Sequence, residues 1–525
     1  MKINSILIVG GGSAGWMTAA GLSSFFPPED KIKISLVESK TIPTVGVGES
    51  TIADRFNEFL IMCGLKDEDW MPHCNAAYKN SLRFTDFRDV GTSFEYPFGN
   101  NYYGKTDLKA WSYLTAKYDL PPESFAEFHC ENTFLAYLNK GTKNKGEEIP
   151  GFDFRYDTAY HFDAKLFTEY LKDNVALPKG LEHYYDDIVG VEKDDDGYIT
   201  SVIGKSDTYS ADLIIDCTGF KSLILEEEMG SEWMSFKPWL SNDRALATHV
   251  PYHDKEKELM NVTECIGMPN GWCWLISLWN HQGMGYVYSS DFVDDDTAEA
   301  EFRAIISKRK GYDVASEAEI KPIRMRHGAH KKAWIKNVVG IGLSYAFIEP
   351  LESTGLLTAY SNIIRIADLI KNRNYNVNRF DIDGFNLTAN HEVNGYRDFV
   401  AAHFGLSSRC DTPYWKYQTQ ERSYVYPSTD DWDKVRVSLF QQSFDDNFAA
   451  AMYSQYHYQE WSPIMRGWIY IMGGMGYKPM SSYEYCSKPN PDAKIEGWLL
   501  HRSKIEEYVK TLPSSYQFLK DTIYG

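Results

Sequence analysis

The first fifty residues follow the hydrophobic pattern of an α/β fold. Residues 5–9 (SILIV) form a short, mainly apolar run, which predicts a buried strand. A glycine-rich turn comes next, followed by a helical pattern over residues 13–25 and a second strand pattern over residues 32–38. This order predicts a strand, a turn, a helix and a parallel second strand.

Two later segments predict further strands of the same sheet. Residues 211–220 (ADLIIDCTGF) indicate a buried strand that ends in a tight turn. Residues 337–370 indicate a strand, a loop that contains Pro350, and a long amphipathic helix. These are the places where a discontinuous dinucleotide-binding fold would return to its central sheet. From about residue 390 onward, the pattern becomes helical and rich in aromatic residues.

Composition and charge exclude several classes of partner. The 525 residues are 43% hydrophobic and 15% aromatic, with a formal net charge of −19. That charge argues against nucleic acids and anionic membranes, which both require a basic surface. The eight cysteines contain no C-x-x-C motif, so we expect reduced thiols, a cytoplasmic location and no metal site. We also expect no signal peptide and no membrane-spanning segment.

The first turn carries the fingerprint of a dinucleotide-binding site. In Gly10-x-Gly12-x-x-Gly15, the first glycine makes the turn, the second admits a phosphate, and the third lets the helix pack on the strand. The helix N-terminus would then face the pyrophosphate. Glu38, directly after the second strand, can accept hydrogen bonds from a ribose hydroxyl. The turn therefore predicts a site for FAD or NAD.

The later segments that are predicted to join the same sheet favour FAD as the cofactor. The strand at 211–220 ends in a glycine turn of the kind that passes close to a flavin. No second nucleotide site is visible, because Gly340-x-Gly342 lacks a third glycine and residues 473–476 lead into Tyr-Lys-Pro. We therefore expect the reduced FAD to come from a separate reductase.

The predicted fold is a Rossmann-like FAD-binding domain of the flavin monooxygenase type, with an integrated and largely helical, aromatic-rich substrate domain. We expect the FAD-binding core to span residues 1–370, with substrate-side insertions around residues 85–160 and 225–330. Residues 371–525 would form the helical substrate-side region.

Four further stretches carry a family resemblance. They are TVGVGESTI (44–52), AAYKNSLRF (76–84), GWCWLISL (271–278) and AFIEPLESTGLL (346–357). Together with the glycine turn, they resemble the flavin-dependent tryptophan halogenases, over residues 1 to about 400. The resemblance implies that reduced FAD, dioxygen and a bound chloride, bromide or iodide form hypohalous acid. The acid is then passed to a lysine beside an indole-like substrate.

The resemblance also implies roles for individual residues. Lys79 matches the lysine and Glu352 the carboxylate near the substrate. Ser353 would connect the flavin and substrate sites, and the backbone amides of Thr354 and Gly355 would hold the halide. A lysine can hydrogen-bond hypohalous acid or capture the halogen as a haloamine, and a carboxylate can stabilise a cationic arene and accept its proton.

The cofactor would contact the glycine turn, the ribose-binding acid, a strap at residues 44–51 and the Pro350 region. The predicted FAD-binding residues are Gly10, Gly12, Ser13, Ala14, Gly15, Glu38, Val45, Gly48, Ser50, Leu343, Ser353 and Leu356.

The sequence departs from the family pattern at three places. Ser277 stands where the family has a proline, and we expect a local effect. Tyr96 replaces a histidine, and its ring together with Phe98 would sandwich an indole. Trp468 and Ile469 replace the tyrosine pair that binds the backbone of tryptophan. Free tryptophan is then a poor substrate, and an indole-like arene fits better.

Alternatives to a halogenase remain open on the sequence alone. A flavin-dependent aromatic hydroxylase would use the same oxidising flavin but would not require Lys79. A flavin-binding scaffold or sensor would tolerate mutation of Lys79 and Glu352. Trp272 and Trp274 face one side of a predicted strand, which suits either core packing or a wall between flavin and substrate. A homodimer is a further expectation.

Overall fold

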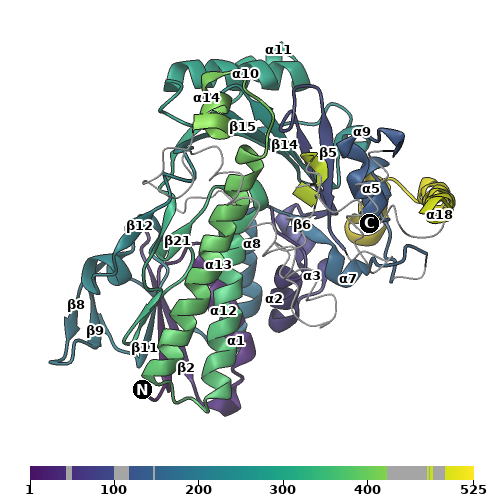
Figure 1. Ribbon diagram of the computed structural model, residues 1–525. Coiled ribbons are helices and arrows are strands. Elements are labelled where there is room, and N and C mark those ends of the chain that lie inside the picture. The colour runs from purple at the N-terminus through teal and green to yellow at the C-terminus, as the bar shows by residue number, and fades with distance from the viewer. Residues whose placement is uncertain are drawn as a thin grey trace. The chain divides into compact units, whose positions relative to one another are not determined.

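The computed structural model describes most of the chain, in two compact units (Figure 1). The described residues are 1–42, 50–99, 117–145, 148–421, 467, 470–471, 473–476 and 491–525. Unit 1 comprises Met1–Ala76, Phe162–Leu240 and Arg326–Asp398, and unit 2 comprises Ala77–His161, Ser241–Met325 and Phe399–Gly525. This geometric division does not test the predicted division into a cofactor core and a substrate-side region at residue 370, which stays a prediction.

Unit 1 is built on a six-stranded sheet. Its order is β19 (Trp334–Ile335), β20 (Val338–Gly340), β11 (Leu213–Asp216), β1 (Ser5–Val9), β2 (Lys33–Glu38) and β7 (Glu182–Tyr185). All neighbouring strands run parallel except β19, which is antiparallel to β20. The central strand β1 is almost wholly buried, as its apolar run predicts. The predicted strands at residues 5–9, 211–220 and 337–340 thus join one sheet.

The helices of unit 1 pack around α1, which follows the glycine turn. They are α1 (Ser13–Phe25), α2 (Arg55–Cys63), α3 (Asp67–Trp70), α8 (Ala164–Tyr170) and α12 (Thr354–Asn372). Helix α1 contacts α12, α2 and α8, and Figure 1 shows α1 and α12 side by side. The predicted helices at residues 13–25 and after Pro350 are therefore confirmed.

Two small sheets complete unit 1. The first has the order β10 (Thr208–Tyr209), β9 (Ile199–Gly204) and β8 (Ile188–Lys193). The second has the order β12 (Trp233–Ser235), β18 (Gly328–His330) and β21 (Ala346–Phe347).

Unit 2 contains a seven-stranded sheet. Its order is β17 (Lys321–Arg324), β13 (Arg244–Val250), β16 (Gln282–Tyr288), β15 (Gly271–Ser277), β14 (Val262–Met268), β4 (Ser81–Thr85) and β5 (Ser93–Pro97). A buried cluster joins this sheet to α10 (Asp295–Lys310) and α11 (Tyr312–Glu317). A separate two-stranded sheet pairs β3 (Ala77–Lys79) with β6 (Ala159–His161).

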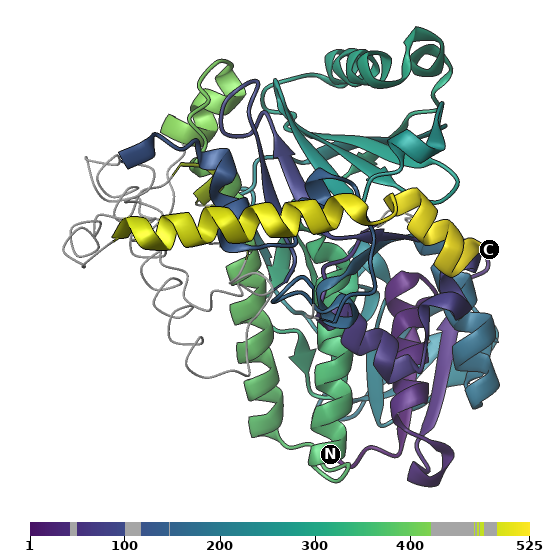
Figure 2. The same cartoon turned by 90° about the vertical axis from the view of Figure 1, so that its right-hand side faces the viewer.

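The remaining helices of unit 2 are mostly short. They are α5 (Phe125–His129), α6 (Thr133–Tyr137), α7 (Phe154–Asp157), α9 (Lys255–Glu258) and α14 (Pro413–Lys416). Helix α13 (Arg379–Gly405) belongs to unit 1 as far as Asp398 and continues into unit 2, where it precedes α14. Helix α18 (Pro491–Thr511) leads into α19 (Ser515–Leu519) near the C-terminus (Figure 2). The helical pattern expected after residue 390 is confirmed for the described residues. None of the described helices is long and apolar enough to cross a membrane.

Candidate active site

The glycine turn of unit 1 has the geometry that its spacing predicts. Gly10 has a φ of +111°, and a Cβ placed on it would lie 2.4 Å from the carbonyl oxygen of Cys217. A Cβ on Gly15 would lie 1.9 Å from the carbonyl oxygen of Gly10. A Cβ on Gly12, in contrast, would meet no atom within 4 Å. The first and third glycines are thus required by close packing, and the second has open space above it.

The Gly342 loop returns the chain to the same turn. Gly342 has a φ of +66°, and a Cβ on it would lie 2.7 Å from the Cβ of Ala14. Its neighbour Leu343 and, at the start of α12, Leu356 are half-buried. Ser13, also half-buried, accepts a hydrogen bond from the Thr168 hydroxyl at 3.1 Å. Four of the predicted cofactor residues thus lie within one unit: Ser13 and Ala14 at the turn, Leu343 in the Gly342 loop and Leu356 at the start of α12.

Glu38 is held over the glycine turn by basic neighbours. Its Oε1 accepts hydrogen bonds from His183 Nε2 at 2.8 Å and Lys172 Nζ at 3.4 Å. Its other oxygen lies only 1.6 Å from the position that a Cβ on Gly11 would take. Burial alone would raise the pKa of Glu38, but the His183 hydrogen bond and the Lys172 charge outweigh it and lower that pKa. Glu38 is thus an ordered, ionised acceptor beside the turn.

These residues fit an FAD molecule. The open space above Gly12, at the N-terminus of α1, suits a pyrophosphate because helix N-terminal amides and dipole favour negative charge. The Glu38 oxygen over Gly11 suits a ribose hydroxyl. Gly11, Lys172 and His183 were missed by sequence reasoning. Gly11 lay inside the quoted motif, whereas nothing in the sequence links residues 172 and 183 to residue 38.

The start of α12 forms the second part of the site in unit 1. Ser353 adopts the left-handed conformation, with a φ of +55°, and α12 begins at the next residue. Its hydroxyl donates to the Ser50 hydroxyl at 3.1 Å, so two of the predicted residues meet. A Cβ on Gly355 would meet no atom within 4 Å, and Thr354 is fully buried. The first N–H groups of a helix have no acceptor within it, so this end can bind an anion.

A fully buried carboxylate precedes that helix end. Glu352 is the last residue of a single helical turn, η9 (Pro350–Glu352), and is 0% exposed. Glu349, immediately before η9, is also 0% exposed. Acidic side chains are rarely buried without a structural or functional reason. The structure thus places two carboxylates in the E-P-L-E stretch, of which the sequence analysis singled out only Glu352.

Lys79 lies at the end of β3 in unit 2 and is 0% exposed. Its Nζ is 5.3 Å from the centre of the Phe98 ring. Lys79 and Phe98 meet because the β4–β5 hairpin begins just after Lys79 and ends just before Phe98. The N–H of Phe98 donates a hydrogen bond to the carbonyl oxygen of Asn80 at 2.9 Å. An ammonium over an aromatic face is stabilised when it is removed from water. Lys79 is therefore a buried and ordered part of unit 2.

A neutral histidine lies close to Lys79. His161 is 0% exposed, with Nδ1 3.2 Å from the Ser277 carbonyl oxygen and Nε2 2.7 Å from the Thr263 hydroxyl. Because a carbonyl can only accept, Nδ1 carries the proton and Nε2 accepts from Thr263. Burial, followed by the charge of Lys79, lowers the pKa of His161 well below 6.5. The structure thereby connects Ser277, one of the departures from the family pattern, to the surroundings of Lys79.

The aromatic pair predicted to contact substrate is buried. The rings of Tyr96 and Phe98 touch edge to face, with centres 5.6 Å apart and planes at 80°. The sandwich of an indole between these two rings stays a prediction. Tyr96 also stacks on Tyr470 at 5.7 Å and 21°, and a Cβ on Gly467 would lie 3.0 Å from the Tyr96 ring. Tyr470 is a neighbour that sequence reasoning missed.

The positions of three predicted site residues lie outside the described residues. They are Val45, Gly48 and Trp468.

A parallel sheet whose first turn leaves room above its second glycine is the architecture of a dinucleotide-binding enzyme. Comparison with known proteins narrows this class. The sequence model of the family described as tryptophan halogenase matches residues 5–489. The chain belongs to that family.

Individual relatives agree with this assignment. The 7-chloro-L-tryptophan 6-halogenase KtzR of Kutzneria sp. (strain 744) is 31% identical over 98% of both chains. The solved structure titled "VirX1 apo structure" is 44% identical over 100% of both chains, with a TM-score of 0.88. The tryptophan 6-halogenase SttH of Streptomyces toxytricini is 28% identical in its crystal structure, which covers 98% of this chain and 99% of its own, with a TM-score of 0.84.

These findings confirm the predicted fold class, the enzyme class and the cofactor. The protein is a flavin-dependent halogenase that uses FAD and halide and acts on an aromatic substrate. They support this activity over hydroxylation. The roles of individual site residues stay predictions.

Proposed function

We propose that the protein halogenates an indole-like arene with hypohalous acid that Lys79 activates. The observation that carries this proposal is the fully buried Lys79 with its Nζ 5.3 Å from the centre of the Phe98 ring. A surface lysine would be solvated and mobile, whereas this one is held in an apolar, aromatic setting. When bound, reduced FAD with dioxygen supplies the oxidising power that converts halide to hypohalous acid.

The residues of unit 1 bind the reactants of the first stage. The glycine turn and Glu38 hold the pyrophosphate and the ribose. The amides of Thr354 and Gly355, at the open start of α12, hold the halide. Ser353, bonded to Ser50 at 3.1 Å, connects the flavin side with the substrate side. Leu343 and Leu356, both half-buried, contact the flavin.

Lys79 and Glu352 act in the second stage. The Lys79 ammonium donates a hydrogen bond to the oxygen of hypohalous acid and thereby polarises the oxygen–halogen bond. The arene attacks the halogen, the oxygen–halogen bond breaks, and the departing hydroxide takes a proton from the Lys79 ammonium and leaves as water. Glu352 stabilises the cationic arene and accepts the ring proton. In sum, an aryl C–H and hypohalous acid give an aryl halide and water.

The substrate we propose is an indole or another electron-rich arene without an amino acid backbone. KtzR and SttH are named as acting on chlorinated tryptophan and on tryptophan, respectively. This chain has Trp468 and Ile469 where the family has a tyrosine pair that binds the tryptophan backbone. Tyr96 and Phe98 offer aromatic side chains, and the sequence assigns Trp468 to the same substrate site. We further propose that bromide and iodide, which are more easily oxidised, are preferred over chloride.

Three features of the proposal concern the protein's surroundings. A separate flavin reductase supplies reduced FAD, because the sequence shows no second nucleotide site. The location is cytoplasmic, since all seven cysteines of the described residues are free and six of them are buried. The protein forms a homodimer, to be checked by light scattering.

The test is mass spectrometry of a reaction that contains the protein, FAD, a generic flavin reductase, NADH, bromide and a panel of indoles with free tryptophan. Brominated indole with little bromotryptophan, absent with Lys79→Ala, is the expected result. Bromotryptophan as the main product would overturn the substrate proposal. Equal bromination by Lys79→Ala would overturn the role of the lysine, and faster turnover with chloride than with an equal concentration of bromide would overturn the halide preference.

A further inference from the structure

We propose that the C-terminal segment, residues 512–525, positions Lys79 from the opposite face of β3. The inference rests on the proposed function, because it assumes that the Lys79 amine takes part in halogen transfer. All the residues involved belong to unit 2. The C-terminal segment lies more than 430 residues from Lys79 in sequence, so only tertiary folding brings the two into one structure.

The strand that carries Lys79 is too short to be rigid by itself. β3 and β6 have three residues each, and among the described strands they pair only with one another. An isolated two-stranded sheet is marginal in water and needs packing on its faces. The rigidity of Lys79 therefore depends on what covers the sheet.

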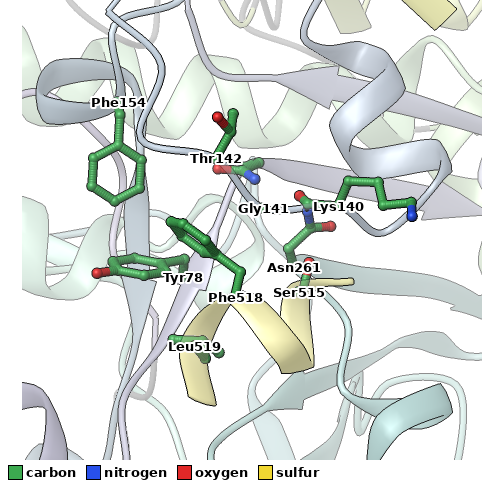
Figure 3. Close-up of a pocket in the computed structure, with 10 residues that line it drawn as sticks. Tyr78, Lys140, Gly141, Thr142, Phe154, Asn261, Ser515, Phe518 and Leu519 are labelled. Carbon is green, nitrogen blue, oxygen red and sulfur yellow. Dashed lines mark hydrogen bonds between the residues drawn. The ribbon is translucent and has the colours of Figure 1, made fainter. Parts of the chain in front are cut away.

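The two faces of β3 have different neighbours. Successive side chains point to opposite faces of a strand, so Tyr78 faces away from Lys79. Tyr78 contacts Phe154 with ring centres 5.0 Å apart and Phe518, on α19, with ring centres 5.7 Å apart. Figure 3 shows the Phe518 ring directed from α19 toward Tyr78 and Phe154. The C-terminal helix thus covers the face of β3 that Lys79 does not use.

The Phe518 ring packs closely against its neighbours. A Cβ on Gly141 would lie 2.4 Å from the Phe518 ring, so the ring rests directly on that glycine. The N–H of Gly141 also donates to the carbonyl oxygen of Pro513 at 3.2 Å. Phe518 is 8% exposed and, with Tyr78 and Phe154, lines a small pocket (Figure 3). The glycine is required because any larger residue would displace the ring.

A chain of hydrogen bonds links the segment to the backbone beside Lys79. The N–H of Ser515 donates to the carbonyl oxygen of Asn139 at 2.9 Å. The side chain of Asn139 accepts from the N–H of Asn261 at 3.0 Å. The carbonyl oxygen of Asn261 in turn accepts from the N–H of Asn80, the residue after Lys79, at 2.7 Å. A shift of the C-terminal segment would thus reach the peptide next to Lys79.

The end of the segment has a second anchor. In the last helical turn, η11 (Lys520–Tyr524), the Tyr524 ring stacks on Trp279 with centres 3.9 Å apart and planes at 3°. Tyr516 stacks on the same ring at 5.6 Å, and Lys255 Nζ lies 3.1 Å from its centre. Trp279 lies two residues after the end of β15. The last residue of β15 is Ser277, whose carbonyl oxygen accepts a hydrogen bond from His161 Nδ1. The segment is therefore fixed at both ends.

The experiment measures how efficiently hypobromous acid is turned into product. Monochlorodimedone, which free hypobromous acid bleaches, reports acid that escapes, and mass spectrometry reports brominated indole. For Phe518→Ala, we expect the ratio of product to total hypobromous acid to fall about tenfold or more, because sub-ångström misplacement of a reacting group slows its step strongly. Total hypobromous acid should stay within about twofold of wild type.

Three variants serve as controls. Phe518→Leu, which keeps most of the buried volume, should restore the ratio to within about twofold. Phe302→Ala removes a more deeply buried ring of unit 2, on α10 (0% exposed, against 8% for Phe518), and should leave the ratio unchanged. Tyr524→Ala removes only a half-buried ring and should lower the ratio about threefold, even if Phe518→Ala does not yield folded protein.

The outcomes separate this inference from the proposed function. A ratio for Phe518→Ala and Tyr524→Ala equal to that of Phe302→Ala, while Lys79→Ala makes no product, would overturn the positioning role. An unchanged ratio for Lys79→Ala would instead overturn the role of the lysine. A fall for Phe302→Ala as large as that for Phe518→Ala would show general destabilisation and also overturn the inference.

Discussion

The glycine turn of unit 1 and the lysine strand of unit 2 are two site regions that are built in different ways. The conformation of the turn follows mainly from its own glycines, since Gly15 rests on the carbonyl oxygen of Gly10, although Gly10 also packs on Cys217 and Ala14 on Gly342. Lys79 depends on Phe98, His161, Asn261 and the C-terminal segment. The backbone conformation of the turn is therefore set by the spacing of nearby glycines, whereas the position of Lys79 is set by contacts with residues far away in the sequence.

This difference predicts how each region fails. The glycine turn should lose its function when a side chain fills the space above it or when a residue cannot adopt the required φ angle. The affinity for the cofactor should then fall. A positioned amine is lost when the amine is removed or displaced, and the loss appears in product formation with the flavin chemistry intact. Four predictions test this contrast, from the largest expected effect to the smallest.

Removal of the lysine charge should have the largest effect. Lys79→Met keeps an unbranched side chain and lowers bromination about a thousandfold, since the amine that polarises hypohalous acid is gone. FAD binding and hypobromous acid formation should be retained, as measured by fluorescence titration and monochlorodimedone bleaching. Loss of FAD binding in this variant would break the contrast between the two regions.

The glycine turn offers a matched pair of variants. Gly12→Ala meets no protein atom within 4 Å, so the unfolding midpoint in urea should stay unchanged while FAD affinity falls about a hundredfold. Gly10→Ala places a Cβ 2.4 Å from the Cys217 carbonyl oxygen at a φ of +111°, so both quantities should fall. The free energy of unfolding should drop by about 1–3 kcal/mol. Equal FAD binding by wild type and Gly12→Ala would contradict the proposed cradle.

Glu38→Gln should have a smaller and more selective effect. Loss of the ionised acceptor beside the ribose weakens FAD binding about tenfold, whereas binding of FMN, which lacks the adenosine, should not change. Isothermal titration with the two flavins measures the difference. An equal loss for both flavins would show that the substitution disturbs the whole turn instead of one contact.

The last of the four effects concerns acid stability alone. Burial lowers the pKa of His129 to about 3, and burial with the Lys79 charge lowers that of His161 well below 6.5. Between these values and pH 6.5, the unfolded chain binds protons that the folded chain does not. The free energy of unfolding should thus fall as the pH drops below 6.5, by about 1.4 kcal/mol per pH unit for each histidine.

The contribution of Glu38, beside the glycine turn, to the free energy of unfolding should change only at lower pH. The pKa of Glu38 is lowered from 4.5, so its contribution is present above pH 4.5 and is lost only as the pH falls further. Urea unfolding at pH 7.5 and 5.5 measures the histidine effect. His161→Gln should make the decline smaller, and the rest comes from His129 and from His330, whose pKa burial also lowers. Equal stability of the wild type at both pH values would contradict the assignment of neutral buried histidines.

Sequence reasoning succeeded where the information is local. The strand, turn and helix at residues 5–25 were predicted because an apolar run and three spaced glycines leave few other conformations. Lys79 was singled out only by its match to the family motif, because a lone lysine would be assigned to the surface, and its burial is a finding of the structure. The edge-to-face contact of Tyr96 and Phe98 was not predicted, since ring orientation depends on the Tyr470 ring, far along the chain.

The sequence by itself determined the class of cofactor, the family resemblance and the candidate residues for the chemistry. Only the tertiary structure decided that His183 and Lys172 hold Glu38, that Ser353 meets Ser50, and that Phe518 supports the strand of Lys79. The physical reason is distance along the chain. Local spacing fixes backbone conformation within a few residues, whereas contacts between residues more than a hundred positions apart arise only when the whole unit packs.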